Sequence, residues 1–133
     1  MKANELTIGD LVKIKDAEFP DHAQVNGIIK KHGAYYAMFG DSLTVIVDKI
    51  EAIPLTMDIL LKNGFTKKFD YKCTLFYEDY YDLYAWEFND GMWQICGHSK
   101  EFAGIPDQQV DVCYVHELQH ALRLFGINKE IEL

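Results

Sequence analysis

The chain has 133 residues, 49% of them hydrophobic and 14% aromatic, and its formal net charge is -8. About 100–150 residues is typical of a single domain, and this hydrophobic fraction supports a core, which excludes wholesale disorder. The acidic charge and the presence of only one arginine, Arg123, argue against nucleic-acid binding, which uses clustered cations and the guanidinium fork.

The three cysteines, Cys73, Cys96 and Cys113, are odd in number and form no C-x-x-C pair. This spacing suits neither a disulfide framework nor a zinc knuckle, so we expect reduced thiols. The start of the chain has no apolar leader, and no run approaches the roughly 20 apolar residues of a membrane span. These features predict a soluble, cytoplasmic protein without a membrane partner.

Residues 1–55 show the patterning of β-strands. Alternating, β-branched and aromatic segments are separated by turn signals such as His32-Gly33 and Gly40-Asp41. Gly27 predicts a bulge or sharp bend. The expected strands cover 11–15, 24–29, 35–39 and 43–47. Short strands at this spacing predict a β-roll or small barrel resembling an SH3-like barrel.

A short helix is predicted at residues 57–63. Thr56 is a good N-cap, Leu55 and Leu60 are placed for a hydrophobic staple, and Gly64 follows the apolar run as a C-terminal cap. This helix separates the β-rich beginning from the rest of the chain.

Three strands and a second helix are expected after the first helix. Residues 71–78, 81–88 and 92–96 predict an antiparallel meander, with a turn at Asn89-Asp90-Gly91. Residues 97–110 predict a loop that leads either into a short strand or straight into the second helix, which is expected over 113–125. The residues Lys129–Leu133 predict an edge strand. The predicted fold is therefore α+β, with a β-roll subdomain at 1–55 and an α-β-β-β-α subdomain at 56–133 packed together as one unit.

His116-Glu117-Leu118-Gln119-His120 matches the H-E-x-x-H signature of zinc hydrolases, in which two histidines bind zinc and the glutamate is the general base. On a helical wheel, however, both histidines fall on the side opposite Leu118, Leu122 and Phe125, which predicts a solvent-facing position. A third ligand, such as His98 or Cys96, is not singled out by spacing. We therefore expect no catalytic, cofactor or metal residues and keep a minimal zinc metallohydrolase as the alternative.

Gly40-Asp41-Ser42-Leu43 resembles the nucleophile block of the GDSL hydrolases, in which Ser42 would be the nucleophile. The β-branched run after it disfavours the helix that such a motif opens, and no histidine has an aspartate three residues before it. The motif predicts a turn between two strands.

Aromatic residues are concentrated between Phe65 and Trp93, which holds 11 of the 18 in the chain. Tyr84, Trp86 and Phe88 share one face of their strand, while Tyr81, Leu83 and Ala85 share the other, so both faces need cover. One interpretation is cover by helices and the β-roll, and the other is a protein-binding or self-association surface.

Three stretches together resemble a set of small uncharacterised proteins from anaerobic gut bacteria, often encoded on prophages or conjugative elements. They are Lys2-Ala3-Asn4-Glu5-Leu6-Thr7-Ile8-Gly9, the hinge Pro54-Leu55-Thr56 to Lys62-Asn63-Gly64-Phe65, and Tyr114-Val115-His116-Glu117-Leu118-Gln119. The family pattern has a variable residue or Gln in place of Glu117 and Asn in place of His120. The resemblance implies no activity, ligand or catalytic residue.

The sequence thus predicts a small acidic accessory protein that is not an enzyme, needs no cofactor and works as a protein-interaction module. A partner protein or a second copy would bind it. Nucleic-acid binding is an alternative only if Lys13, Lys15, Lys30 and Lys31 converge on one face.

Overall fold

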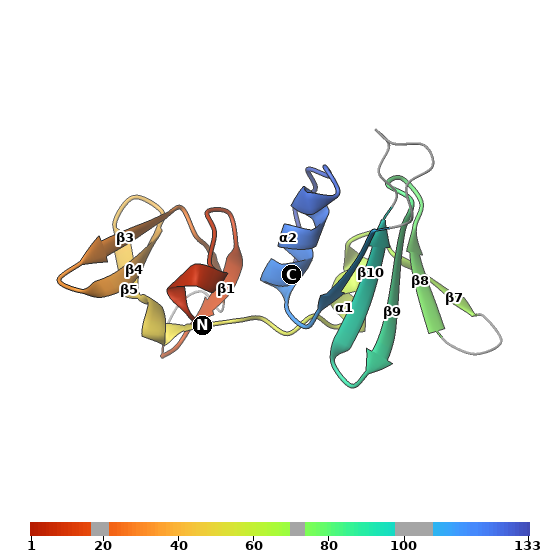
Figure 1. The fold of residues 1–133 in the computed structure, drawn as a ribbon, viewed down its shortest axis with the longest axis horizontal. Coiled ribbons are helices and arrows are strands. Elements are labelled where there is room, and N and C mark those ends of the chain that lie inside the picture. Colours follow the sequence, from red (N-terminus) through yellow and green to blue (C-terminus); the bar gives the residue numbers. More distant parts are fainter. Residues whose placement is uncertain (17–21, 70–73, 98–107) are drawn as a thin grey trace. The chain divides into compact units, whose positions relative to one another are not determined.

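A computed structural model describes residues 1–16, 22–69, 74–97 and 108–133 (Figure 1). They form two compact units, Met1–Ile53 and Pro54–Leu133. The fold is α+β, with antiparallel strands and two α-helices. Among the residues that the structure describes, no helix has the length and apolar character needed to cross a membrane. The predicted packing of the two halves as one unit stays a prediction.

The first unit consists of short strands and two 3-10 turns. Its strands pair in two three-stranded sheets, with orders β2-β1-β6 and β3-β4-β5. The elements are η1 Ala3–Glu5, β1 Leu11–Ile14, β2 Ala23–Gln24, β3 Gly27–Lys31, β4 Ala34–Phe39, β5 Leu43–Ile46, η2 Val47–Lys49 and β6 Ile50–Glu51.

The two small sheets share one apolar core. Its members come from every part of the unit: Leu6, Val12, Ile14, Val25, Ala37, Phe39, Val47 and Ile50. None of the sheets in the described residues closes, so the SH3-like barrel is not confirmed. The strand predicted over 24–29 is in fact two strands in different sheets. The chain bends between them before Gly27, where an added Cβ would lie 3.2 Å from the sulfur of Met38.

The second unit is a five-stranded antiparallel sheet with two helices. The strand order is β11-β10-β9-β8-β7. The elements are α1 Met57–Lys62, β7 Thr66–Phe69, β8 Thr74–Glu78, β9 Leu83–Asn89, β10 Met92–Gly97, β11 Gln108–Val112 and α2 Val115–Leu124. The predicted antiparallel meander is present as β8, β9 and β10, and the sheet is larger than predicted because β7 and β11 add a strand at each edge.

Local capping fixes both helices close to the predicted positions. The Thr56 hydroxyl accepts a hydrogen bond from the Ile59 amide, and Gly64 ends α1 with a φ of 87°. Gly126, with a φ of 75°, ends α2, and the Ile127 amide donates to the Leu122 carbonyl at 2.8 Å. Such left-handed positions favour glycine because it has no Cβ.

Both helices lie on the same side of the five-stranded sheet (Figure 1). On that side Phe76, Ala85 and Ile95 form a buried row across three strands. An added Cβ on Gly97 would lie 2.8 Å from the ring of Phe125, at the end of α2, so the glycine allows the close approach. The core of this unit is thus between the helices and one face of the sheet.

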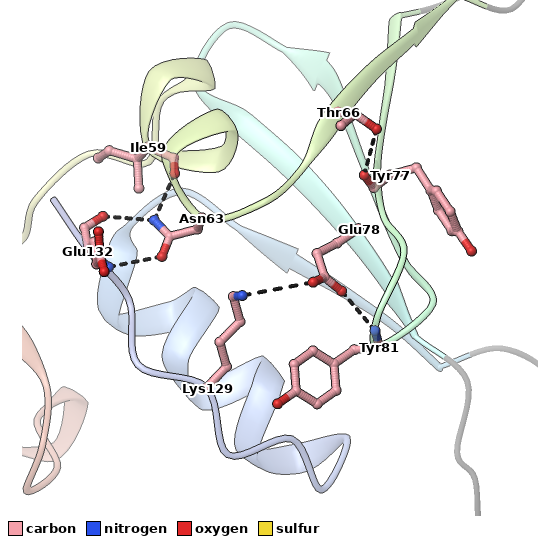
Figure 2. Close-up of polar contacts among 8 residues, drawn as sticks. All are labelled: Ile59, Asn63, Thr66, Tyr77, Glu78, Tyr81, Lys129 and Glu132. Carbon is pink, nitrogen blue, oxygen red and sulfur yellow. Dashed lines mark hydrogen bonds and ion pairs between the residues drawn. The ribbon is translucent and has the colours of Figure 1, made fainter.

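The last seven residues run back along the helical side as an extended segment without strand pairing (Figure 2). The buried side chain of Asn63 donates to the Glu132 carbonyl at 2.7 Å and accepts from the Glu132 amide at 2.9 Å. Lys129 lies 3.8 Å from Glu78, which also accepts from the Tyr81 amide. The predicted edge strand at Lys129–Leu133 is wrong, because side chains rather than a neighbouring strand bind this backbone.

Candidate functional site

The face of the sheet opposite the helices carries two rows of side chains from all five strands. Paired residues of antiparallel strands project to the same face. The first row is Lys68, Leu75, Trp86, Gln94 and Asp111, and the second is Thr66, Tyr77, Tyr84, Cys96 and Gln109. With Phe88 at the end of β9, we call this surface the aromatic face. Leu75, Tyr77, Tyr84 and Trp86 are half-buried, and Phe88 is 37% exposed.

The aromatic rings of this face contact one another in pairs. The ring centroids of Tyr77 and Tyr84 are 4.7 Å apart, and those of Trp86 and Phe88 are 6.1 Å apart. The ammonium of Lys68 lies 4.1 Å from the centroid of the Tyr77 ring, a cation–π contact. The aromatic side chains of this face are therefore packed in pairs rather than isolated.

Two aromatic residues of this face, Trp86 and Tyr77, donate hydrogen bonds to neighbouring side chains. The Trp86 indole donates to Gln94 Oε1 at 3.0 Å, and Gln94 Nε2 donates to Asp111 Oδ1 at 3.1 Å. The Tyr77 hydroxyl donates to Asp82 Oδ1 at 2.9 Å. Because a polar group that already has a partner costs less to bury, covering this face leaves neither the indole nor the phenol unsatisfied.

The hydrogen bond from Tyr77 to Asp82, desolvation of the phenol and the charge of Asp82 raise the pKa of Tyr77 to about 12. The native state therefore holds this proton more tightly than the unfolded chain, whose tyrosine pKa is near 10.0. The resulting stabilisation is complete below the unfolded pKa and is lost as the pH rises through the folded pKa. Tyr77 stays neutral at any physiological pH.

We expect an alkaline titration followed by tyrosinate absorbance to show a late phase from Tyr77 in the wild type. Tyr77→Phe should remove that phase, and Asp82→Asn should move it to lower pH because it removes the carboxylate that accepts the phenol proton. Asparagine tolerates the positive φ of 55° at position 82. A late phase unchanged by Asp82→Asn would contradict the assignment.

The predicted division of the β9 side chains between the two faces is confirmed. Tyr84, Trp86 and Phe88 lie on the aromatic face, and Leu83 and Ala85 are fully buried on the helical side. Tyr81 lies in the turn before the strand. The sequence reasoning missed Lys68, Gln94 and Asp111, because their place on this face follows from strand pairing.

The H-E-x-x-H residues begin α2. Glu117 Oε2 accepts hydrogen bonds from the backbone amides of Cys113 at 2.6 Å and Tyr114 at 3.1 Å. A carboxylate at this position satisfies amides that the helix leaves without partners. In this arrangement Glu117 acts as a helix cap.

The two histidines differ in their surroundings. His116 is only 4% exposed, and its ring stacks on Tyr114 with centroids 5.8 Å apart, whereas His120 is half-buried. The prediction that both face solvent is therefore wrong for His116. The helical-wheel prediction assigned burial from hydrophobicity alone. The buried side of α2 also includes the polar side chains of His116 and Gln119.

A metal centre is not formed by the residues that the structure describes. Among residues 1–16, 22–69, 74–97 and 108–133, no three histidine, cysteine, aspartate or glutamate side chains are grouped to hold a metal ion. His98, one of the ligands considered, lies outside these ranges. The zinc hydrolase based on His116, Glu117 and His120 stays an untested alternative.

Ser42 lies in the turn from Gly40 to Ser42 between β4 and β5, as predicted for a structural role of the motif. Gly40 has a φ of 56°, and its amide donates to the Asn26 side chain at 2.7 Å. The Gly-Asp-Ser residues thus shape a hairpin loop.

The four lysines considered for nucleic acid do not share one face. Lys30 and Lys31 are consecutive in β3, so their side chains project to opposite sides of the sheet. Lys15 is 3.2 Å from Glu51. Convergence of all four lysines, the condition for this alternative, is not met.

Cys113 precedes α2 and is partly buried. Burial, followed by the charges of Glu117 and Asp111, raises the pKa of the Cys113 thiol. Cys113 is a free cysteine. Because the thiolate is the reactive form, this environment does not suit Cys113 as a nucleophile.

The first unit has an open hollow of about 620 Å³ beside η1. Its walls are Met1, Lys2, Ala3, Asn4, Gly33, Ala34, Tyr35, Ile46, Val47 and Asp48. Ligand sites are usually deeper and have several converging polar groups. The walls contain many short side chains, and their charged side chains, Lys2 and Asp48, are exposed, so we assign no ligand to it.

No family model, curated protein or solved structure matches the chain.

Proposed function

We propose that this protein is a small acidic accessory protein, not an enzyme, that acts by binding another protein through the aromatic face. The observation that carries the proposal is the composition of this face. An antiparallel sheet with helices on one side normally presents polar side chains on the other. Here that side has Leu75, Tyr77, Tyr84, Trp86 and Phe88.

Two properties of the aromatic face support protein binding. Tyrosine and tryptophan are enriched in the centres of protein interfaces and supply much of their binding energy. The internal hydrogen bonds of Trp86 and Tyr77 also lower the cost of removing water from the surface.

The proposal includes a cytoplasmic location, which the free thiol of Cys113 supports because reduced cysteines are typical of reducing compartments. The SH3-like character of the first unit and an origin on a prophage or conjugative element also belong to the proposal.

The test compares three immobilised proteins: the wild type, Trp86→Ala and Tyr80→Ala. Trp86 is at the centre of the aromatic face, whereas Tyr80 is a 76% exposed aromatic residue in the turn beside it. After incubation with an extract of the source organism, we expect the wild type and Tyr80→Ala to retain the same proteins. Trp86→Ala should retain roughly tenfold less, because truncating a central aromatic residue costs about 1–2 kcal/mol or more.

Circular dichroism spectra would first show that the variants are folded. Equal retention by all three proteins would contradict the proposal. So would a wild type that binds neither an extract protein nor a second copy of itself.

A further inference from the structure

The aromatic face has opposite charges at its two edges. In the first row, Lys68 lies on the edge strand β7 and Asp111 on the other edge strand, β11, and both side chains are exposed. Between them the order is Leu75, Trp86 and Gln94. Trp86 is therefore the middle residue of a row with a cation at one end and an anion at the other.

From this arrangement we propose that the partner of the aromatic face is a second copy of the same chain. The inference rests on the proposed function and names its partner. Two sheets would pack face to face around a two-fold axis parallel to the strands. The axis passes between the two copies of β9, so each Trp86 meets the partner's Trp86.

Such an axis reverses the order of the strands across the interface. The β7 edge of one copy then faces the β11 edge of the other. Lys68 of each copy lies opposite Asp111 of its partner, which gives two equivalent ion pairs. A two-fold axis along the row would instead place Lys68 against Lys68, so the charges select the first arrangement.

The second row is compatible with the same axis. Tyr84 is its middle residue, and the neighbouring positions are Tyr77 and Cys96. In a face-to-face pair, Tyr77 of one copy would lie opposite Cys96 of the other. The ring of Tyr77 would be buried with its hydroxyl still bonded to Asp82.

The size of the face sets the expected affinity. Five strands at a spacing of about 4.8 Å give a width of about 19 Å, which makes a small interface. Interfaces of this size are typical of weak complexes, and we expect a dissociation constant on the order of 10–100 µM. The fraction of dimer should therefore rise as the protein concentration rises and fall on dilution. Added salt should weaken the dimer, because its ion pairs are at the rim of the interface.

The test is a charge swap followed by sedimentation equilibrium and light scattering. Lys68→Glu alone and Asp111→Lys alone each replace two attractions with two repulsions and should weaken the dimer roughly tenfold. The double variant Lys68→Glu, Asp111→Lys should restore the affinity to within about threefold of the wild type, because the pairs form again with reversed sign. Lys67→Glu is the matched control, since Lys67 is the exposed neighbour on β7 that projects to the other side.

Each outcome separates this inference from the proposed function. A wild type that stays monomeric at about 1 mM overturns the inference, and capture of another protein that depends on Trp86 would then leave the proposed function in place. A dimer that Trp86→Ala removes, but that the double variant does not restore, overturns the two-fold arrangement alone. The absence of any binding that depends on Trp86 overturns both.

Discussion

Replacing Trp93 by alanine is expected to lower the free energy of unfolding of the second unit by about 3–5 kcal/mol. Trp93 is only 2% exposed, and its ring meets Phe76 edge to face with centroids 5.6 Å apart. Its indole nitrogen also donates to the Leu55 carbonyl at 3.2 Å, just before α1. The substitution would remove the packing and leave that carbonyl without its indole donor.

The other tryptophan is the matched control for this prediction. Trp86 lies on the neighbouring strand β9 but projects to the aromatic face, so Trp86→Ala should cost about 1 kcal/mol or less. Urea denaturation followed by circular dichroism measures both changes, and fluorescence of the remaining tryptophan gives a second probe. Similar losses for the two variants would contradict the assignment of the faces.

Replacing Asn63 by alanine is expected to lower the free energy of unfolding by about 2–3 kcal/mol. The Asn63 amide donates to the carbonyls of Ile59 and Glu132, and its oxygen accepts from the Glu132 amide. Aspartate at this position would keep the acceptor but lose both donors, so Asn63→Asp should also be destabilising. Thermal unfolding of the purified variants measures the effect.

Two controls connect this loss to the C-terminal segment. Asn128→Ala changes an exposed asparagine of the same segment and should alter stability by less than about 0.5 kcal/mol. Removing residues 127–133 should destabilise more than Asn63→Ala, because Ile127 and Ile131 are buried. In the shortened chain Asn63→Ala should have a smaller effect than in the full chain. An equal effect in both backgrounds would show that Asn63 acts independently of Glu132.

The structure confirms the predictions that depend on neighbouring residues. Thr56 and Gly64 define α1, and the glycine turns before β5 and β10 lie where the sequence places them. Capping and turn chemistry act within a few residues, so a sequence pattern is enough to predict them. The division of β9 into two faces is predictable for the same reason, because side chains alternate in any strand.

The predictions that failed concern pairing across the chain. β7 was not predicted from the sequence, and it is seen as a strand through its pairing with β8. β11 is the short strand that the sequence left as one of two alternatives before the last helix, and its pairing with β10 decides between them. The burial of His116 and the side-chain bonds of Asn63 to Glu132 were missed because these contacts depend on how distant segments meet.

By itself, the sequence determined the helix boundaries, the main turns and the concentration of aromatic residues before Trp93, because these follow from local capping, alternation and composition. Only the tertiary structure decided which side of the sheet the helices cover and therefore which aromatic residues stay accessible. It also brought Lys68 and Asp111 to opposite ends of one row. The physical reason is that strand register, which sets these neighbours, is fixed by hydrogen bonds between segments far apart in the chain.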